Sequence, residues 1–445
     1  MAAVSSFIRW GLILPLIVVA FAVAYRLQQP LTASENEKPV TYCYKSIRTH
    51  DPDQAEAQCF TVTDGVFTAV GPSDADHTTV DGHVIPGLWD GHGHLLQYGE
   101  FLHSVDLFAA QSLEEVRTRI KSYISENPGA GSKDNWVRGV GWDQTFFGRM
   151  PTATQSSATY TLCSTVSTST VQSVKLFADG ALGSWGSALL DPYSDHPWTS
   201  GSLLINASAL TDVTQRWAAD GYQVNIHAIG DLANRNAVDA LEAALVQQCL
   251  NEATAQGISP STPGQSPHDS QDQIGARAAC QSRHRFRIEH AQIIHPDDQK
   301  RILSLGIIPS IQPTHATSDM KYAQSRLGKD RTSSSAYRMR SLLPARPVLG
   351  SDFPSHTGRG TEDSPDGWYT DEALSLDEAM WGFTGAPAYG AFLDGRAGVI
   401  REGALADWVV LDQPIESYGI EELRTLRVKE TWVAGKRVYI RFDDD

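Results

Sequence analysis

The sequence has no run rich in arginine or lysine, and only five of its 445 residues are cysteine. Its 36 basic residues are outnumbered by 52 acidic ones, which gives a net charge of −16 at pH 7. A chain this acidic is repelled by nucleic acid and by anionic membrane surfaces, so neither is expected as its main partner. The apolar content of 41% and charged content of 20% are ordinary for a globular protein with a sizeable core.

Strongly apolar runs of near-membrane length are scarce, and the one of interest, Trp10 to Tyr25, follows Arg9 at the N-terminus. It is short for a membrane span but adequate for the core of a signal peptide or for a tilted anchor. Small-residue cleavage sites are present, so cleavage and retention both stay open. Residues 1–30 are therefore expected to be a signal peptide or a single-pass membrane anchor. Either one directs the chain into the secretory pathway, as a membrane-anchored or a secreted protein.

Four of the five cysteines could form two disulfides, which would fit an oxidising compartment. Cys43 and Cys59 lie on neighbouring strand-like segments and could pair, as could Cys249 and Cys280 across a polar loop, with Cys163 left over. Five free buried thiols are the alternative. The tripeptide Asn206-Ala207-Ser208 is a glycosylation acceptor if it is exposed.

Strand-like segments occupy both ends of the chain, and an alternating pattern lies between them. The N-terminal β segments run from Val40 to Val70, and the C-terminal ones from Trp408 to Phe442. Between them, short apolar runs alternate with amphipathic helices such as the one that Ser112 would cap. This alternation is typical of βαβ units and a parallel sheet. We expect a composite β-sandwich from residues 40–82 and 400–442, and a second domain over residues 83–399.

The stretch around two closely spaced histidines is the most informative part of the chain. The apolar run Val84 to Trp89 predicts a buried strand, and it ends in Asp90-Gly91-His92-Gly93-His94. Imidazoles at i and i+2 of an extended segment point to the same side, so both can reach one ion. Imidazole suits zinc. Two exposed loop histidines are the alternative.

Other polar residues also close apolar runs further along the chain. Together with the histidine pair they are His92, His94, Lys175, His227, His290 and Asp352. In a (β/α)₈ barrel the reactive groups sit at such strand ends, and this set suits one or two divalent ions, zinc being the first choice. Lys175 could ligate only as a carbamate, and its alternative is a buried amine paired with Asp179.

The order His-x-His, Lys, His, His, Asp resembles the amidohydrolase superfamily, and most closely its YtcJ-like amidohydrolase family 3 branch. The matching segments are Pro86 to His94, Gly141 to Gln144, Lys175 to Ser184, His227 to Asp231, Arg287 to Gln292, Gly350 to Pro354 and Gly403 to Asp412. The resemblance implies an α/β fold, a metal-dependent (β/α)₈ TIM-type barrel flanked by a β-sandwich built from both chain ends.

The resemblance also implies roles for single residues. His92 and His94 would be first-strand ligands, and Lys175 a carboxylated, bridging fourth-strand ligand. His227 and His290 would be ligands on the fifth and sixth strands. Asp352 would be the eighth-strand ligand and the general base, and His315 would lie near the substrate.

The chain departs from this pattern before Lys175, where one strand–helix unit of the barrel is shortened or missing. A Ser/Thr-rich stretch from Pro151 to Ser173 stands in its place. Either Tyr160 to Val166 serves as a makeshift third strand, or the chain is a defective product with open sheet edges.

The expected function is a metal-dependent hydrolase of amide or other non-peptide C–N bonds that uses metal-activated water. Its partner would be a small, amide-like molecule. Whether the chain forms a homodimer stays open. Membrane contact would occur only through the N-terminal segment. The alternative is a membrane-tethered pseudoenzyme or a truncated inactive isoform without a complete barrel.

Overall fold

The computed structural model describes residues 38–73, 78–94, 98–99, 101–107, 110, 112–130, 137, 139–140, 172–255, 271–352, 368–423 and 425–442. The chain divides into two compact units, Met1–Gly87 with Val399–Asp445, and Leu88–Gly398. The secretory segment expected over residues 1–30, Cys163 and the strand expected over Tyr160 to Val166 all lie outside the described residues. Within the described ranges, no helix combines the length and apolarity needed to cross a membrane.

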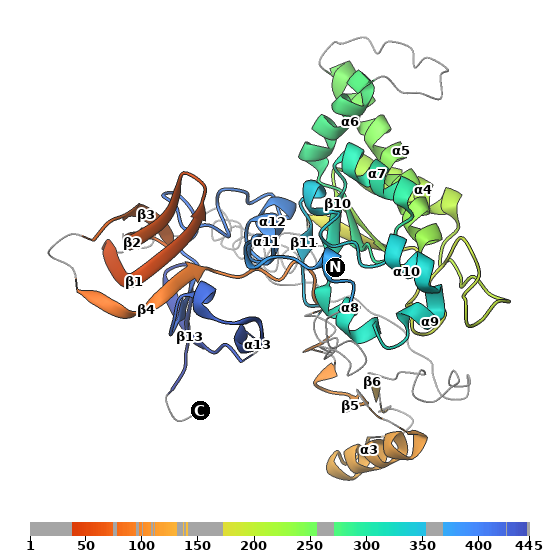
Figure 1. The fold of residues 1–445 in the computed structure, drawn as a ribbon, viewed down its shortest axis with the longest axis horizontal. Coiled ribbons are helices and arrows are strands. Elements are labelled where there is room, and N and C mark those ends of the chain that lie inside the picture. Colours follow the sequence, from red (N-terminus) through yellow and green to blue (C-terminus); the bar gives the residue numbers. More distant parts are fainter. Residues whose placement is uncertain are drawn as a thin grey trace, which may run out of the picture. The chain divides into compact units, whose positions relative to one another are not determined.

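The first unit is a seven-stranded sheet to which both ends of the chain contribute (Figure 1). Its order is β14-β13-β12-β4-β1-β2-β3, and only the β1–β4 pair is parallel among the registered pairs. The N-terminal strands are β1 (Val40–Asp51), β2 (Gln54–Thr63), β3 (Val66–Gly71) and β4 (Thr79–Pro86). The C-terminal strands are β12 (Trp408–Leu411), β13 (Val428–Val433) and β14 (Lys436–Ile440), with the short helix α13 (Ile420–Leu423) between β12 and β13.

An aromatic core holds this sheet together. The ring centroids of Phe60 lie 4.9 Å from those of both Phe67 and Trp408, and Trp408 stacks on Trp432 at 4.7 Å. The start of β3 also hydrogen-bonds to residues 403–406, since Phe67 N donates to Ala404 O at 2.9 Å. The sheet therefore curls until its β3 end meets the segment before β12. The two-layer sandwich expected from the sequence stays a prediction.

A disulfide crosses two neighbouring strands of this sheet. Cys43 on β1 is directly opposite Cys59 on β2, and the two sulfurs are bonded. The pairing that the sequence suggested for these two residues is confirmed. Cys249 and Cys280, the other suggested pair, are free thiols.

The second unit is an α/β structure around a five-stranded parallel sheet of order β11-β10-β9-β8-β7. The strands are β7 (Ser173–Phe177), β8 (Gln223–Ala228), β9 (Arg287–His290), β10 (Ile308–Ile311) and β11 (Val348–Leu349). A separate parallel pair, β5 (Val105–Asp106) and β6 (Gly139–Val140), lies earlier in the chain. The alternating pattern thus gave a parallel sheet, as expected, while the closed eight-stranded barrel stays a prediction.

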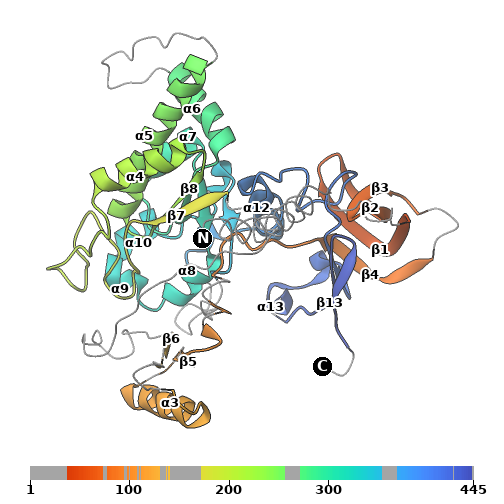
Figure 2. The same ribbon diagram turned by 180° about the vertical axis from the view of Figure 1, so that it is seen from behind.

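Helices alternate with these strands along the chain, and several of them pack on the five-stranded sheet, whereas the first one named below lies beside β5 (Figures 1 and 2). The longer ones are α3 (Leu113–Glu126), α4 (Ala207–Ala219), α5 (Asp231–Ala255), α6 (Gln271–His284) and α7 (Pro296–Leu305). The shorter ones are α8 (Pro313–Asp319), α9 (Ala323–Leu327), α10 (Lys329–Ser335), α11 (Leu376–Gly382) and α12 (Gly385–Gly390). Every residue of β9 and β10 is buried, as expected for a strand with parallel neighbours and helices on its faces.

Local signals fixed where several helices begin. Ser112 caps α3 by accepting a hydrogen bond from Glu115 N, as the sequence predicted. Pro296 occupies the first turn of α7, where its missing N–H has no helical partner to lose. Asn206, exposed on the surface, caps α4 through its bond from Ala209 N.

One strand was assigned wrongly from the sequence. The run Val84 to Trp89 was expected to be a strand that leads straight into the histidines, but β4 ends at Pro86. Its last residues pair with β12, with Val84 opposite Val410, so β4 belongs to the sheet of the chain ends. Apolar content cannot reveal this, because a buried strand in either sheet carries the same side chains.

Candidate metal centre

The segment that carries His92 lies against β11, the strand that leads to Asp352. Gly91 N donates to Leu349 O at 3.0 Å, and Asp352 N donates to His92 O at 2.8 Å. The approach depends on a glycine, because a Cβ on Gly91 would lie 2.1 Å from Val348 Cγ1 and 2.6 Å from Leu349 O. Two residues 260 positions apart in the chain are thereby brought into one site.

Two side chains of the site stand on unusual backbone. His290 has φ of 73° and Asp352 has φ of 54°, both in the left-handed region that residues with a Cβ seldom adopt. Such a conformation costs on the order of 1–3 kcal/mol and persists only where surrounding structure imposes it. Its occurrence at His290, the last residue of β9, and at Asp352, three residues after β11, marks this edge of the sheet as a functional candidate.

One group of potential ligand atoms comes from His92, His290 and Asp352. One nitrogen or oxygen of each lies within 4.8 Å of the other two. All three side chains are largely withdrawn from solvent. Ligand atoms of one tetrahedral zinc ion are separated by about 3–4 Å, so this group has suitable spacing.

Hydrogen bonds fix the protonation of the two imidazoles. His92 Nδ1 lies 2.5 Å from Glu289 Oε2, and His290 Nδ1 lies 2.8 Å from Gln312 Oε1. Because both oxygens only accept, each Nδ1 carries the proton. The Nε2 atoms of His92 and His290 thus keep a lone pair when neutral, which is the tautomer that a metal requires.

The contact between His92 and Asp352 requires a cation. His92 Nε2 is buried without a hydrogen bond, yet it lies 3.3 Å from Asp352 Oδ1. A lone pair that faces a carboxylate oxygen at this distance is repelled unless a proton or a metal ion lies there. The donor set of two imidazoles and a carboxylate suits zinc and similar divalent ions. The residues present therefore fit a metal.

Two more histidines approach the same carboxylate. His94 Nε2 lies 2.9 Å from Asp352 Oδ1, and His315 Nε2 lies 3.0 Å from Asp352 Oδ2. Burial alone would raise the pKa of Asp352, but the hydrogen bond with His315 above all holds it well below its ordinary value. Asp352 is therefore anionic and is the centre of the cluster.

His227 joins the cluster through ring packing. Its ring centroid is 4.4 Å from that of His290, and its Nε2 atom is buried without a hydrogen bond, 3.5 Å from Asp179 Oδ1. Burial lowers the pKa of His227 to about 3, with Lys175 adding to the shift, so the ring is neutral at pH 7.

Lys175 lies on β7 but does not pair with Asp179 as the alternative interpretation expected. Asp179 accepts hydrogen bonds from Ile229 N, Gly230 N and Ala188 N at 2.8–3.0 Å. Burial nevertheless raises the pKa of Asp179 to about 7. Lys175 Nζ instead lies 5.3 Å from the Phe177 ring centroid, and among the described residues it forms no ion pair. Burial lowers the pKa of Lys175, against the attraction of Glu289 and Asp352.

Sequence reasoning assigned no role to the residues that orient the ligands. Glu289 is held by Arg287, whose Nε lies 2.8 Å from Glu289 Oε1, and Arg287 also donates to Gly91 O at 2.9 Å. Asp90 accepts from His92 N and Ser351 N at 3.1 and 2.9 Å. Glu289 adjoins His290 in the sequence, and this adjacency was the only available signal.

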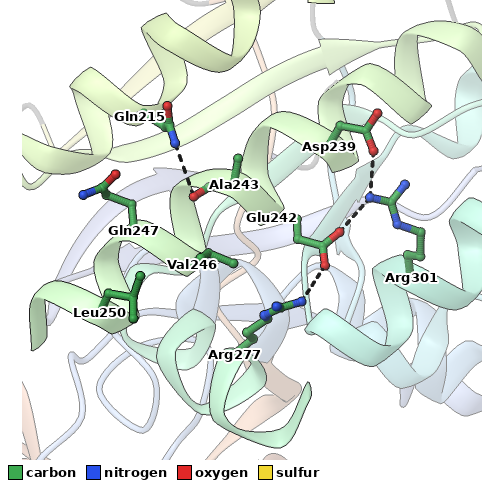
Figure 3. Close-up of a pocket in the computed structure, with 9 residues that line it drawn as sticks. All are labelled: Gln215, Asp239, Glu242, Ala243, Val246, Gln247, Leu250, Arg277 and Arg301. Carbon is green, nitrogen blue, oxygen red and sulfur yellow. Dashed lines mark hydrogen bonds and ion pairs between the residues drawn. The ribbon is translucent and has the colours of Figure 1, made fainter. Parts of the chain in front are cut away.

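A pocket of about 540 Å³ lies away from these histidines, among α4, α5, α6 and α7 (Figure 3). Its polar wall is an ion-pair network in which Arg301 contacts Asp239 and Glu242 at 2.7 Å, and Arg277 contacts Glu242 at 2.9 Å. Each charge in this network has a partner of opposite sign. The pocket contains none of the candidate ligands.

Comparison with known proteins identified a matching family and several related proteins. The profile of the amidohydrolase family matches residues 152–439. Protein LONG AFTER FAR-RED 3 of Arabidopsis thaliana is 30% identical over 279 residues, which are 60% of this chain and 42% of that protein. Putative amidohydrolase YtcJ of Bacillus subtilis (strain 168) is 26% identical over 60% of this chain and 46% of its own length. An N-substituted formamide deformylase of Arthrobacter pascens is 26% identical over 60% and 45%.

The chain spans about half the length of these curated relatives. Among solved structures, an uncharacterized metal-dependent hydrolase from Pyrococcus horikoshii OT3 has a TM-score of 0.58 at 19% identity, over 84% of this chain and 98% of that one. A second one, from Pyrococcus furiosus, has a TM-score of 0.56 at 19% identity, over 84% and 99%. These likenesses concern the fold. With a family profile matched over more than half of its residues, the chain belongs to the amidohydrolase family, in the family 3 branch that its motifs indicated.

Proposed function

We propose that this protein is a metal-dependent hydrolase that cleaves amide or other non-peptide C–N bonds of small molecules. The observation that carries the proposal is the group formed by His92, His290 and Asp352, whose ligand atoms lie within 4.8 Å of one another. Family membership supports it, and the formamide deformylase among the relatives makes N-substituted formamides a first substrate class to try.

The residues of the site have different roles in metal binding and proton transfer. His92, His290 and Asp352 would hold a divalent ion, with His94 and His227 as further ligands. Such an ion supplies a Lewis acid that polarises a carbonyl and lowers the pKa of water to about 7. Asp352 accepts the proton of the attacking water and passes it to the leaving nitrogen. His315, in contact with Asp352 Oδ2, orients this carboxylate toward the substrate.

Lys175 is proposed as the bridge to a second ion, in carboxylated form. A lowered pKa increases the fraction of free amine, which is the form that reacts with carbon dioxide. Lys175→Ala should release one of two metal equivalents, and a short-chain carboxylic acid should restore part of the loss. If the wild type binds two ions and Lys175→Ala also binds two, Lys175 is not a metal ligand.

The experiment that tests the function combines metal content with turnover. Purified protein would be loaded with zinc, analysed for bound metal, and assayed on N-acyl, formamide, cyclic amide and ester substrates. We expect one to two equivalents of metal and turnover of a C–N substrate that chelation abolishes. Metal binding without turnover of any substrate would favour the alternative, a tethered pseudoenzyme or inactive isoform.

We also propose that the chain enters the secretory pathway through residues 1–30. The Cys43–Cys59 disulfide fits an oxidising compartment, and Asn206 of the Asn206-Ala207-Ser208 tripeptide is exposed. In eukaryotic cells the full chain should therefore carry an endoglycosidase-sensitive glycan that Ser208→Ala removes. A reporter fused after Pro30 that stays cytosolic and soluble would refute the proposal.

A further inference from the structure

A second group of metal-binding side chains lies on α5 and α6, which pack side by side (Figures 1 and 2). Cys249 and Glu252 are three residues apart on α5, and Cys280 and His284 are four residues apart on α6. Residues with these spacings share one face of a helix. Each helix therefore presents a thiol and a second potential ligand on a single face.

The contacts show that the two faces meet. His284 Nε2 lies 3.0 Å from Glu252 Oε1, and Cys280 Sγ lies 3.8 Å from Glu252 Oε2. One ligand atom each from Glu252, Cys280 and His284 lies within 4.8 Å of the others. Cys249 lies one helical turn before Glu252 on α5, outside this group of three, and its thiol would have to approach the ion as the fourth ligand. Zinc bonds of 2.0–2.3 Å place tetrahedral ligand atoms about 3.3–3.8 Å apart, which is close to the spacing here.

We propose that Cys249, Glu252, Cys280 and His284 form a structural site for zinc or another thiophilic divalent ion that joins α5 to α6. Four protein ligands leave no open position, which is the arrangement of structural rather than catalytic zinc. The site shares no residue with the cluster around Asp352, so it stands whether or not the protein is a hydrolase.

Arg283 fits this site as a neighbour of the ligands. Its guanidinium pairs with Glu252 Oε2, with Nε at 3.1 Å, while Oε1 faces His284. Two thiolates and a carboxylate would leave one excess negative charge around a divalent ion, and Arg283 offsets it. Arginine thereby orients the carboxylate without binding the ion.

A disulfide between Cys249 and Cys280 is the competing use of the two neighbouring sulfurs. Both cysteines are free thiols in the structure. A disulfide would use neither Glu252 nor His284, whose ligand atoms lie within 4.8 Å of the Cys280 sulfur. The convergence of a carboxylate, a thiol and an imidazole, with Cys249 one helical turn from Glu252, therefore favours the ion.

Cobalt(II) tests the proposal in the full-length protein, because thiolate ligands give a charge-transfer band in the near ultraviolet that histidine and carboxylate ligands do not. The experiment uses a Cys163→Ser background, which removes the one cysteine that lies outside the described residues. We expect the band in this background, and its loss together with about one metal equivalent in Cys280→Ser. Arg283→Gln, the matched control next to the ligands, should keep the band.

His284→Gln provides a second measurement that leaves both sulfurs in place. It should retain a thiolate band but weaken cobalt affinity at least tenfold, while circular dichroism reports an intact fold. The proposal is overturned if the band is equal with and without Cys280, or if peptide mapping finds a Cys249–Cys280 disulfide and the reduced protein takes up no cobalt. It is also overturned if Arg283→Gln abolishes the band as Cys280→Ser does.

Discussion

Glu289 holds His92 by its Nδ1 atom at 2.5 Å, although 197 positions separate the two residues in the chain. A carboxylate behind a metal-binding imidazole fixes the tautomer and makes the ring a stronger ligand. Glu289 is itself fixed by Arg287, so the orientation of His92 depends on a buried ion pair.

Replacing Glu289 with glutamine should weaken metal binding by about 10–100-fold, the usual effect of losing such a supporting carboxylate. Calorimetric titration of metal-free protein with zinc measures this. Asp298→Asn is the matched control, because Asp298 is also buried and pairs with Arg235 and Arg301, away from the histidines. Equal losses of affinity in both variants would mean that general destabilisation is the cause.

Asp352→Asn should abolish turnover while leaving the fold in place. Asparagine is nearly isosteric and tolerates the left-handed conformation of residue 352, but it cannot accept the proton of water. We expect a fall in kcat of at least about 100-fold on any substrate found for the wild type. A folded variant with wild-type kcat would assign the general base to another residue.

The metal-free protein should lose stability on acidification because of His227. The pKa of His227 is about 3 in the fold, below the ordinary value of 6.5, so the unfolded chain takes up the proton first. The contribution of neutral His227 to the free energy of unfolding is therefore fully present above pH 6.5 and is lost as the pH falls toward 3. Between pH 6.5 and 5 the effect is up to about 2 kcal/mol. Urea unfolding of chelator-treated protein at both pH values measures it, and His227→Gln should reduce the slope.

Gly91→Ala should damage the metal centre without touching a ligand. The added Cβ would meet Val348 and Leu349 O, so the segment that carries His92 must move from β11. We expect a loss of about 1–3 kcal/mol in unfolding free energy and weaker metal binding. Gly99→Ala is the control, because no atom of the described residues lies within 4 Å of its added Cβ. Zinc affinity like that of the wild type in Gly91→Ala would contradict the close approach described above.

The sequence by itself determined the elements that depend on local chemistry. Ser112 marked the start of one helix, and short apolar runs marked β7 to β11, because capping and burial act within a few residues. The order of polar residues after these runs also named His92, His290 and Asp352 as members of one site.

Only the tertiary structure decided which sheet β4 joins, and which residues orient the ligands. Val84 pairs with Val410, and Glu289 with His92, across separations that no local pattern records. The same holds for Cys249 and Cys280, whose neighbours Glu252 and His284 came together only when α5 packed on α6. The physical reason is that hydrogen-bond and ligand geometry depends on positions fixed to within an ångström, and packing of distant segments sets those positions.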